Sequence, residues 1–341
     1  MTLASLGWDA SFAAAFEPFD AHGLVPARVA VRHHGPCVLL AEQGALGGVP
    51  AGRLDEDALP AVGDWVAARP LPGERKAVIE AVLPRRSAFV RKEPWRRAAE
   101  QVLAANVDVA FLVAALGRDL SLRRLERYLM LAQESGAAPV VVLTKADLSP
   151  DPGLARAEVA SIASGVPVHI TSSVTGEGLD AVRAALTPAT TGVLLGSSGV
   201  GKSTLANRLL GRAHFRTRAL RRDDRGRHTT TRRELVVLPG GGLLLDTPGL
   251  RELQLWGGED ALARAFDDVV RLAEGCRFRD CAHTVEPGCA VLEAVDSGLL
   301  PPERLASFRK LQRELRAVEG RRAGRLAPRG NGDTQNRRRR R

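Results

Sequence analysis

The sequence predicts a multidomain protein with an N-terminal β-barrel, a central α/β domain built on a parallel sheet, and a C-terminal helical domain. Short strand-like runs between turn residues fill the first hundred residues, and strands and helices then alternate. A cluster of cysteines interrupts the helical sequence that follows. We therefore expect domains at residues 1–97, 98–257 and 258–320, followed by a disordered basic tail at residues 321–341.

Composition places the chain among ordinary globular proteins. With 341 residues, 45% of them apolar, it is long enough for two or three domains with proper cores. It has no run of 18 apolar residues, and its N-terminus lacks the pattern of a signal peptide. We therefore expect a cytoplasmic protein with no membrane partner.

The formal net charge of +10 is concentrated in one segment. Residues 304–341 hold 14 Arg and Lys against 3 Asp and Glu, which leaves a net charge of about −1 for residues 1–303. Two local basic patches remain, ten Arg against three acidic residues in 208–234 and six Arg and Lys against one Glu in 85–97. Any surface that binds nucleic acid is therefore local and does not follow from the overall charge.

The first hundred residues have the pattern of a small barrel. About five short strands, separated by turn residues such as Leu71-Pro72-Gly73, favour a closed sheet. An OB-type barrel is the commonest fold of this kind, and an SH3-like barrel is an alternative with the same periodicity. We expect strands at Arg28–Arg32, Cys37–Ala41, Asp64–Ala68 and Lys76–Val82, with a turn over Gly44–Gly48.

The central region alternates strands with helices, which predicts a parallel sheet with helices on both faces. After Gly257 the chain is helical and includes a charged amphipathic helix from Pro302 to about Val318. The expected central strands are Val107–Ala115, Pro139–Leu143, Pro167–Ile170, Val193–Leu195, Leu235–Leu238 and Leu243–Leu245. The expected central helices are Ser121–Glu134, Leu154–Ala163, Gly178–Leu186 and one that begins at Lys202.

A glycine-rich phosphate-binding motif follows the strand Val193–Leu195. Its backbone N–H groups can converge on phosphates, and the N-terminal end of the following helix favours an anion. Lys202 would reach the β and γ phosphates, and the Ser203 hydroxyl would bind magnesium. A chance match in a glycine-rich chain is the alternative, and the flanking strand and helix argue against it. The expected ligands are Gly196, Ser197, Ser198, Gly199, Val200, Gly201, Lys202, Ser203 and Thr204.

A second motif distinguishes GTP from ATP. The carboxylate of Asp147 can accept hydrogen bonds from guanine N1 and the exocyclic amine, a pair of donors that adenine does not offer, while the stem of Lys145 can lie along the base. A helix cap with a solvated Asp147 is the alternative. Support comes from a second strand end, where a serine pair occupies the loop expected behind guanine O6. The expected base-site residues are Thr144, Lys145, Ala146, Asp147, Ser172 and Ser173.

A third motif, Asp246-Thr247-Pro248-Gly249, completes a guanine-nucleotide site. Asp246 ends a buried strand and can bind magnesium through water, and the Gly249 N–H can contact the γ phosphate. The first switch is expected around Gly226–Thr231, where one threonine, with Thr229 and Thr230 as candidates, binds magnesium. Because the base-reading motif precedes the phosphate loop, the reverse of the order in an ordinary G protein, the sequence predicts a circularly permuted GTPase.

The cysteine cluster has the spacing of a metal site. Cys276, Cys281, His283 and Cys289 give the pattern C-x4-C-x-H-x5-C. Thiols stay reduced in the cytosol, and three thiolates with one imidazole suit tetrahedral zinc with no open position. We therefore expect one structural zinc ion per chain, with unligated buried cysteines as the alternative. Cys37 has no partner in the sequence and is expected in a core.

Three segments, taken with the permuted motif order, resemble the ribosome small-subunit-dependent GTPase A family (RsgA/YjeQ): Gly226–Thr231, Asp246–Glu252 and Cys276–His283. The resemblance covers the chain from the barrel to the helix after the cysteines. It implies an OB barrel, a permuted GTPase domain and a zinc domain in a factor that binds the small (30S) ribosomal subunit and its 16S rRNA late in maturation. It also implies GTP hydrolysis that the subunit stimulates, followed by release. One departure is Thr144, where many members have Asn. Its hydroxyl can still bind the loop, so we expect a modest effect on affinity.

The group that positions the attacking water is not in its usual place. Leu250 stands where a Ras-like enzyme has Gln, so we expect slow intrinsic hydrolysis. His228 is the candidate, because a neutral imidazole can accept a proton or position water, and RNA contact is its alternative role. Gly199 occupies the place of an asparagine that some potassium-stimulated GTPases use, so potassium dependence is not expected.

Two other functions stay open from the residues alone. One is an RNA-binding assembly chaperone with a vestigial nucleotide site, and the other is a P-loop ATPase or kinase. Measurements of GTP and ATP turnover, with and without ribosomal subunits, distinguish these two functions from a GTPase. Such a GTPase would bind GTP or GDP together with magnesium. In each case we expect a monomer.

Overall fold

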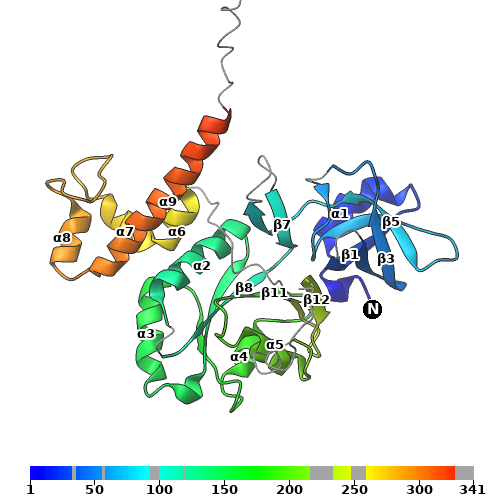
Figure 1. Cartoon of the computed structure of the whole chain (residues 1–341), viewed down its shortest axis with the longest axis horizontal. Coiled ribbons are helices and arrows are strands. Elements are labelled where there is room, and N and C mark those ends of the chain that lie inside the picture. Colours follow the sequence, from blue (N-terminus) through cyan, green and yellow to red (C-terminus); the bar gives the residue numbers. More distant parts are fainter. Residues whose placement is uncertain are drawn as a thin grey trace, which may run out of the picture. The chain divides into compact units, whose positions relative to one another are not determined.

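In this computed structural model, the described residues are 1–32, 36–55, 58–92, 100–117, 120–215, 233–246 and 259–326. The chain divides into two compact units, Met1–Gln254 and Leu255–Arg341 (Figure 1). Among the described residues, no helix has both the length and the apolar character needed to cross a bilayer.

Five strands near the N-terminus form a closed barrel. The strand order is β1-β2-β3-β5-β4, and an additional pairing of β1 with β4 closes the sheet. All neighbours are antiparallel except β3 and β5. This order is that of an OB-type barrel and excludes the SH3-like alternative. The strands are β1 (Val25–Arg32), β2 (Cys37–Ala41), β3 (Gly44–Pro50), β4 (Trp65–Pro70) and β5 (Lys76–Val82), and their core includes Ala27, Val29, Leu39, Val66 and Ile79.

Three features of this region differ from the sequence predictions. The expected turn over Gly44–Gly48 is wrong, because these residues belong to β3. A Cβ atom at Gly48 would lie 2.8 Å from the Leu39 side chain, so this glycine reflects close packing inside the barrel. The sequence interpretation also missed helix α1 (Ala10–Asp20) and the hairpin of β6 (Ala88–Lys92) with β7 (Glu100–Ala105).

Helix α1 covers part of the barrel. The Asp9 carboxylate accepts hydrogen bonds from the N–H groups of Ser11 and Phe12, which caps the N-terminal end of the helix. The buried ring of Phe12 lies with its centroid 5.8 Å from that of Trp65 on β4, and Trp8 contacts the same indole. A short 3-10 helix, η1 (Ala4–Leu6), precedes α1.

The central sheet has the predicted permuted topology. Its strand order is β10-β9-β8-β11-β13-β12, with every neighbour parallel except β12. The chain therefore runs outward from β8 to β10 and then returns to place β11 against β8. The strands are β8 (Val109–Ala115), β9 (Ala138–Thr144), β10 (Val168–Ile170), β11 (Thr191–Leu195), β12 (Arg233–Val237) and β13 (Leu243–Asp246).

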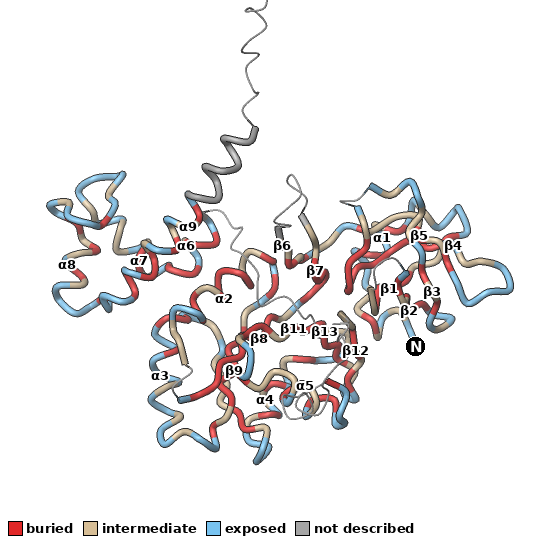
Figure 2. The backbone as a smooth tube through the Cα atoms, viewed as in Figure 1, coloured by how far each residue is buried: buried red, intermediate tan, exposed pale blue. Residues whose placement is uncertain are grey.

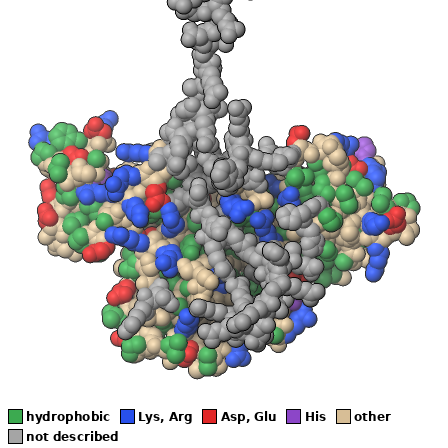
Figure 3. Space-filling model, in the orientation of Figure 1, with side chains coloured by type: hydrophobic (Ala, Val, Ile, Leu, Met, Phe, Trp, Pro, Cys, Tyr) green, Lys and Arg blue, Asp and Glu red, His purple; other side chains and the backbone are tan. Residues whose placement is uncertain are grey.

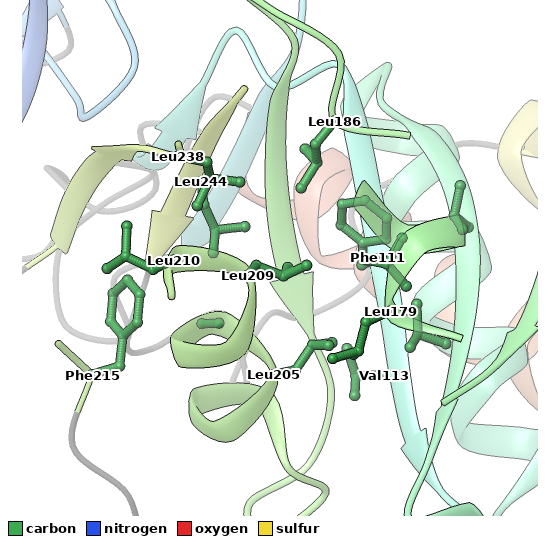
Figure 4. Packing of buried hydrophobic residues seen from close by; sticks show 14 of the residues in the cluster. Phe111, Val113, Leu179, Leu186, Leu205, Leu209, Leu210, Phe215, Leu238 and Leu244 are labelled. Carbon is green, nitrogen blue, oxygen red and sulfur yellow. The ribbon is translucent and has the colours of Figure 1, made fainter. Parts of the chain in front are cut away.

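Helices pack on this sheet through its alternating apolar side chains. On β8, Phe111 and Val113 belong to a core that also contains Leu205 and Leu209 of α5 (Figure 4). Helix α2 contacts β8 and β9, and α3 contacts β10. The buried stretches run along the strands in Figure 2. The helices are α2 (Leu122–Ser135), α3 (Pro152–Ile162), α4 (Leu179–Ala184) and α5 (Lys202–Leu210), close to their predicted ranges.

Among the contacts that join the barrel to the central sheet are a strand pairing and a buried arginine. The end of β1 pairs with β12, with Val31 opposite Glu234, so the two sheets form one 11-stranded sheet. Arg28 of β1 is 2% exposed, and it donates to the Asn106 carbonyl at 3.0 Å and to the Thr191 hydroxyl at 2.9 Å. Burial lowers the pKa of Arg28 to about 10. Because these acceptors include the first residue of β11, the barrel and the phosphate-loop strand share one polar core.

The C-terminal unit is helical, as predicted. Phe266, Val269, Val291 and Phe308 are buried in it, and the Arg304 guanidinium pairs with the Asp268 carboxylate at 2.8 and 2.9 Å. Figure 3 shows Lys and Arg side chains at the surface of this unit and of the N-terminal unit. The helices are α6 (Glu259–Ala265), α7 (Asp267–Ala273), α8 (Ala290–Asp296) and α9 (Pro302–Leu326).

Candidate functional site

The phosphate-binding motif lies between β11 and α5. Three of its glycines have positive φ angles, 150° at Gly196, 86° at Gly199 and 99° at Gly201. A Cβ atom at Gly196 would lie 2.3 Å from the Val113 carbonyl oxygen of the neighbouring β8, so only glycine fits there. The strand, loop and helix that the sequence predicts are all present.

Lys202 lies against this loop. Its Nζ donates to the carbonyl oxygens of Gly196 at 2.7 Å and of Ser197 at 2.6 Å. Ser203 is half-buried in the first turn of α5. The ammonium, the N-terminal end of α5 and the loop N–H groups together make a positive environment that suits a phosphate chain.

The base-reading motif contacts the phosphate loop directly. β9 ends at Thr144, whose buried hydroxyl donates to the Val200 carbonyl oxygen at 2.5 Å. Lys145 has a left-handed φ of 62°, and the N–H of Ala146 donates to the Thr171 carbonyl oxygen at 3.1 Å. Thr144 therefore binds the phosphate loop through its hydroxyl.

Asp147 lies beside the serine loop that follows β10. The residue is exposed, and its Oδ1 accepts a hydrogen bond from the Ser172 hydroxyl at 2.5 Å. Ser172 is buried, and its Oγ also accepts from the N–H groups of Val174 and Thr175, each at 3.2 Å. The structure thus brings together the two loops that the sequence assigns to the guanine base.

The expected magnesium side of the site is described only in part. β13 ends at Asp246 and pairs with β11, which brings its end to the same edge of the sheet as the phosphate loop. The side chain of Asp246 lies outside the described part of the structure. His228, Thr229, Thr230, Gly249 and Leu250 lie outside the described residues.

Four expected metal ligands converge in the C-terminal unit. The ligand atoms of Cys276, Cys281, His283 and Cys289 all lie within 4.8 Å of one another. The Cys276 and Cys289 sulfurs are 3.8 Å apart, and they lie 3.6 and 3.4 Å from His283 Nδ1. Zinc bonds of about 2.3 Å to sulfur and about 2.0 Å to nitrogen, in a tetrahedron, place sulfurs about 3.8 Å apart and sulfur and nitrogen about 3.5 Å apart. None of the chain's four cysteines, Cys37 included, forms a disulfide. The four donors of this cluster fit a tetrahedral metal ion.

One residue that the sequence interpretation missed organises the metal loop. The Glu286 carboxylate accepts hydrogen bonds from the N–H groups of Ala282, Thr284 and Val285 at 2.6 to 3.1 Å. The bond from Thr284 contributes most to lowering the pKa of Glu286, to about 2. This loop presents His283, whose φ of 55° is left-handed. No spacing rule for metal ligands includes such a carboxylate, so no pattern in the sequence indicates this residue.

Comparison with known proteins shows the family to which the chain is similar. Residues 82–256 match the model of a family described as RsgA GTPase. The chain is 54% identical to the small ribosomal subunit biogenesis GTPase RsgA of Opitutus terrae, over 92% of this chain and 90% of that protein. It is 51% identical to the protein of the same description from Streptomyces coelicolor, over 92% and 86%.

Two solved structures share the fold. The crystal structure of YjeQ from Thermotoga maritima aligns with a TM-score of 0.63 and 28% identity, over 86% of this chain and 98% of that one. The circularly permuted GTPase YloQ aligns with a TM-score of 0.62 and 24% identity, over 87% and 96%.

Proposed function

Because the chain belongs to the RsgA GTPase family, we propose that it binds the small ribosomal subunit, assists its late maturation and leaves after GTP hydrolysis. The chain is a GTP hydrolase of that family. The observation that carries the GTPase part of this proposal is the contact between Thr144 and the phosphate loop. It joins a guanine-reading motif to a phosphate-binding motif although their order in the chain is reversed.

We assign GTP and GDP binding to the loops at the carboxyl edge of the permuted sheet. Asp147 reads the guanine base, and Lys202 neutralises the phosphates. Magnesium, when bound, offsets negative charge on the phosphates, and Ser203, Asp246 and one of Thr229 and Thr230 are its proposed ligands. The remaining proposed GTP contacts are Thr144, Lys145, Ala146, Ser172, Ser173, Gly196, Ser197, Ser198, Gly199, Val200, Gly201, Thr204 and Gly249.

We propose that the metal held by the C-terminal cluster is one structural zinc ion. Three thiolates and an imidazole fill a tetrahedron, which leaves no position for a reactive water, and the distances between donors fit zinc. The zinc would supply folding energy to a unit whose helices are short on either side of the ligand loop.

We propose 16S rRNA as the partner surface on the subunit, contacted by a monomer in the cytoplasm. The parts of the chain that we propose to contact the rRNA are the barrel, the basic first switch and the C-terminal domain. The proposed domains are residues 1–97, 98–257 and 258–320, with the tail at 321–341. Each neutralised phosphate contributes a slope of roughly −0.7 to −0.9 in log affinity against log salt, so subunit binding should weaken steeply as salt rises.

Turnover measurements test the proposal. GTP and ATP hydrolysis are measured with the full chain, alone and with purified small or large subunits. We expect slow GTP turnover that rises with small subunits only, and no competing ATP turnover. Absence of GTP turnover with small subunits would favour an RNA-binding chaperone, and ATP turnover would favour a P-loop ATPase.

His228 is the proposed group that positions the attacking water. We expect His228→Ala to keep GTP and subunit binding but to lose stimulated turnover by on the order of a hundredfold. His214→Ala is the control, since His214 precedes that segment in the sequence and its Nε2 lies 3.3 Å from a carboxylate oxygen of Glu234. Full stimulation of the His228→Ala enzyme would assign this step to another group, including one that the ribosome supplies.

A further inference from the structure

We infer that Arg208 positions the base-reading Asp147 through a relay of hydrogen bonds, a role that rests on the proposed guanine site. Arg208 lies on α5, the helix that begins at the phosphate loop. The buried face of this helix carries Leu205 and Leu209, whereas Arg208 is exposed. Its side chain reaches the loop after β10, which lies 34 and 35 residues earlier in the chain.

The guanidinium binds two successive carbonyl oxygens of that loop. Nε of Arg208 donates to the Ser173 carbonyl at 2.6 Å, and a terminal nitrogen donates to the Val174 carbonyl at 3.2 Å. The planar fork of arginine suits two neighbouring acceptors. Arg183 of α4 supports this end of the helix, because it donates to the Arg208 carbonyl at 3.2 Å.

These two carbonyls belong to the peptide groups whose N–H ends bind Ser172. The Ser173 carbonyl and the Val174 N–H share one peptide, and the Val174 carbonyl and the Thr175 N–H share the next. Both N–H groups donate to Ser172 Oγ at 3.2 Å. The Ser172 hydroxyl in turn donates to Asp147 Oδ1 at 2.5 Å.

All the donors in this relay point from Arg208 toward Asp147. A positive guanidinium polarises both peptides, and polarised N–H groups strengthen the hydroxyl bond to the carboxylate. The relay therefore sets the orientation of the carboxylate that must meet two donors of the base. Among the described residues, the hydrogen bonds of this relay run from Arg208 to the loop after β10 and on to Asp147, so its effect should be confined to base recognition.

Measurements of the affinity for GDP, ADP and tripolyphosphate, made on the full chain with zinc bound, test this inference. We expect Arg208→Ala to weaken GDP binding by about tenfold, the range of a lost charged hydrogen bond, and to reduce the preference for GDP over ADP. Binding of inorganic tripolyphosphate, which has no base, should be unchanged. Arg208→Lys should recover part of the GDP affinity. The matched control Arg212→Ala removes an exposed positive charge just past the end of α5. It should change the affinity for neither GDP nor tripolyphosphate. Unchanged GDP affinity in Arg208→Ala, or an equal loss for tripolyphosphate, overturns the inference.

A double-mutant cycle separates a relay from general support of the loop. If Arg208 acts through Ser172, adding Arg208→Ala to Ser172→Ala should cause little further loss of GDP affinity. Additive losses would overturn the relay. Asp147→Asn separates this inference from the function on which it rests. If that variant keeps full GDP affinity, the guanine site itself is wrongly assigned. If it loses guanine preference while Arg208→Ala does not, only the role of Arg208 fails.

Discussion

The nucleotide site and the metal site place their functional groups in opposite ways. In the N-terminal unit, Thr144, Asp147 and Lys202 follow directly from strand ends or open a helix, and hydrogen bonds join their loops to one another. In the C-terminal unit, the ligands from Cys276 to Cys289 stand between α7 and α8, in a segment with no helix or strand of its own.

The two sites draw their stability from different sources. Buried strands lie on both sides of β11, and the Thr144 hydroxyl joins the end of β9 to the phosphate loop, so the sheet itself orders these nucleotide loops. The metal loop has few internal bonds beyond those to Glu286 among its described residues, so the metal ion itself must supply much of its order. Loss of one side chain should therefore affect the two sites very differently.

The largest effect is expected from Cys281→Ser. Structural zinc supplies about 10–16 kcal/mol of apparent binding energy in small zinc domains, so loss of one thiolate should release zinc and unfold the C-terminal unit. Elemental analysis should find one zinc per chain in the parent and none in the variant, while isolated GDP binding persists. Cys37→Ala, in the barrel core, is the control and should keep its zinc. Equal zinc content in Cys281→Ser and its parent would contradict the assignment.

A smaller effect is expected at the base. Asp147→Asn replaces an acceptor with an amide that opposes guanine N1–H, so GDP affinity should fall by on the order of a hundredfold or more and xanthosine nucleotides should be preferred. Competition binding with GDP and XDP measures this. Asp151→Asn is the control, because Asp151, four residues after Asp147, caps α3 by accepting a hydrogen bond from the Leu154 N–H. Retained preference for GDP would remove Asp147 from the site.

The predictability of each region follows the same contrast. Buried strands such as Val140–Leu143 have unbroken apolar runs, so the sequence alone predicts where they end and which polar residues follow. Long-range tethers have no local pattern. Arg28 meets Thr191 across 163 residues, and nothing in the sequence near Arg28 indicates it. The role of a glycine is hard to predict for a related reason. The residues around Gly48 resemble a turn, but Gly48 lies in a strand where a larger side chain would collide with Leu39.

Glu286→Ala measures how far the protein itself orders the metal loop. The carboxylate accepts three backbone N–H groups around His283, and loss of such an outer partner typically costs about 10- to 100-fold in metal affinity. Competition with a zinc chelator gives the affinity. Glu293→Ala, on α8 and further along the chain, should have no effect. An unchanged zinc affinity in Glu286→Ala would mean that the four ligands alone determine the site.

The smallest effect is expected from Thr144→Val, which removes one hydrogen bond from a site that the fold already organises. Valine keeps the shape of threonine but leaves the Val200 carbonyl of the phosphate loop without the Thr144 hydroxyl as a donor. A net loss of about 1 kcal/mol corresponds to about a fivefold weaker GDP affinity, and Thr144→Ser, which keeps a hydroxyl, should restore most of it. Calorimetric titration with GDP measures the change. A loss as large as that of Asp147→Asn would mean that the two loops are ordered mainly by this one bond, and the contrast between a site held by the sheet and a site held by its ligand would then fail.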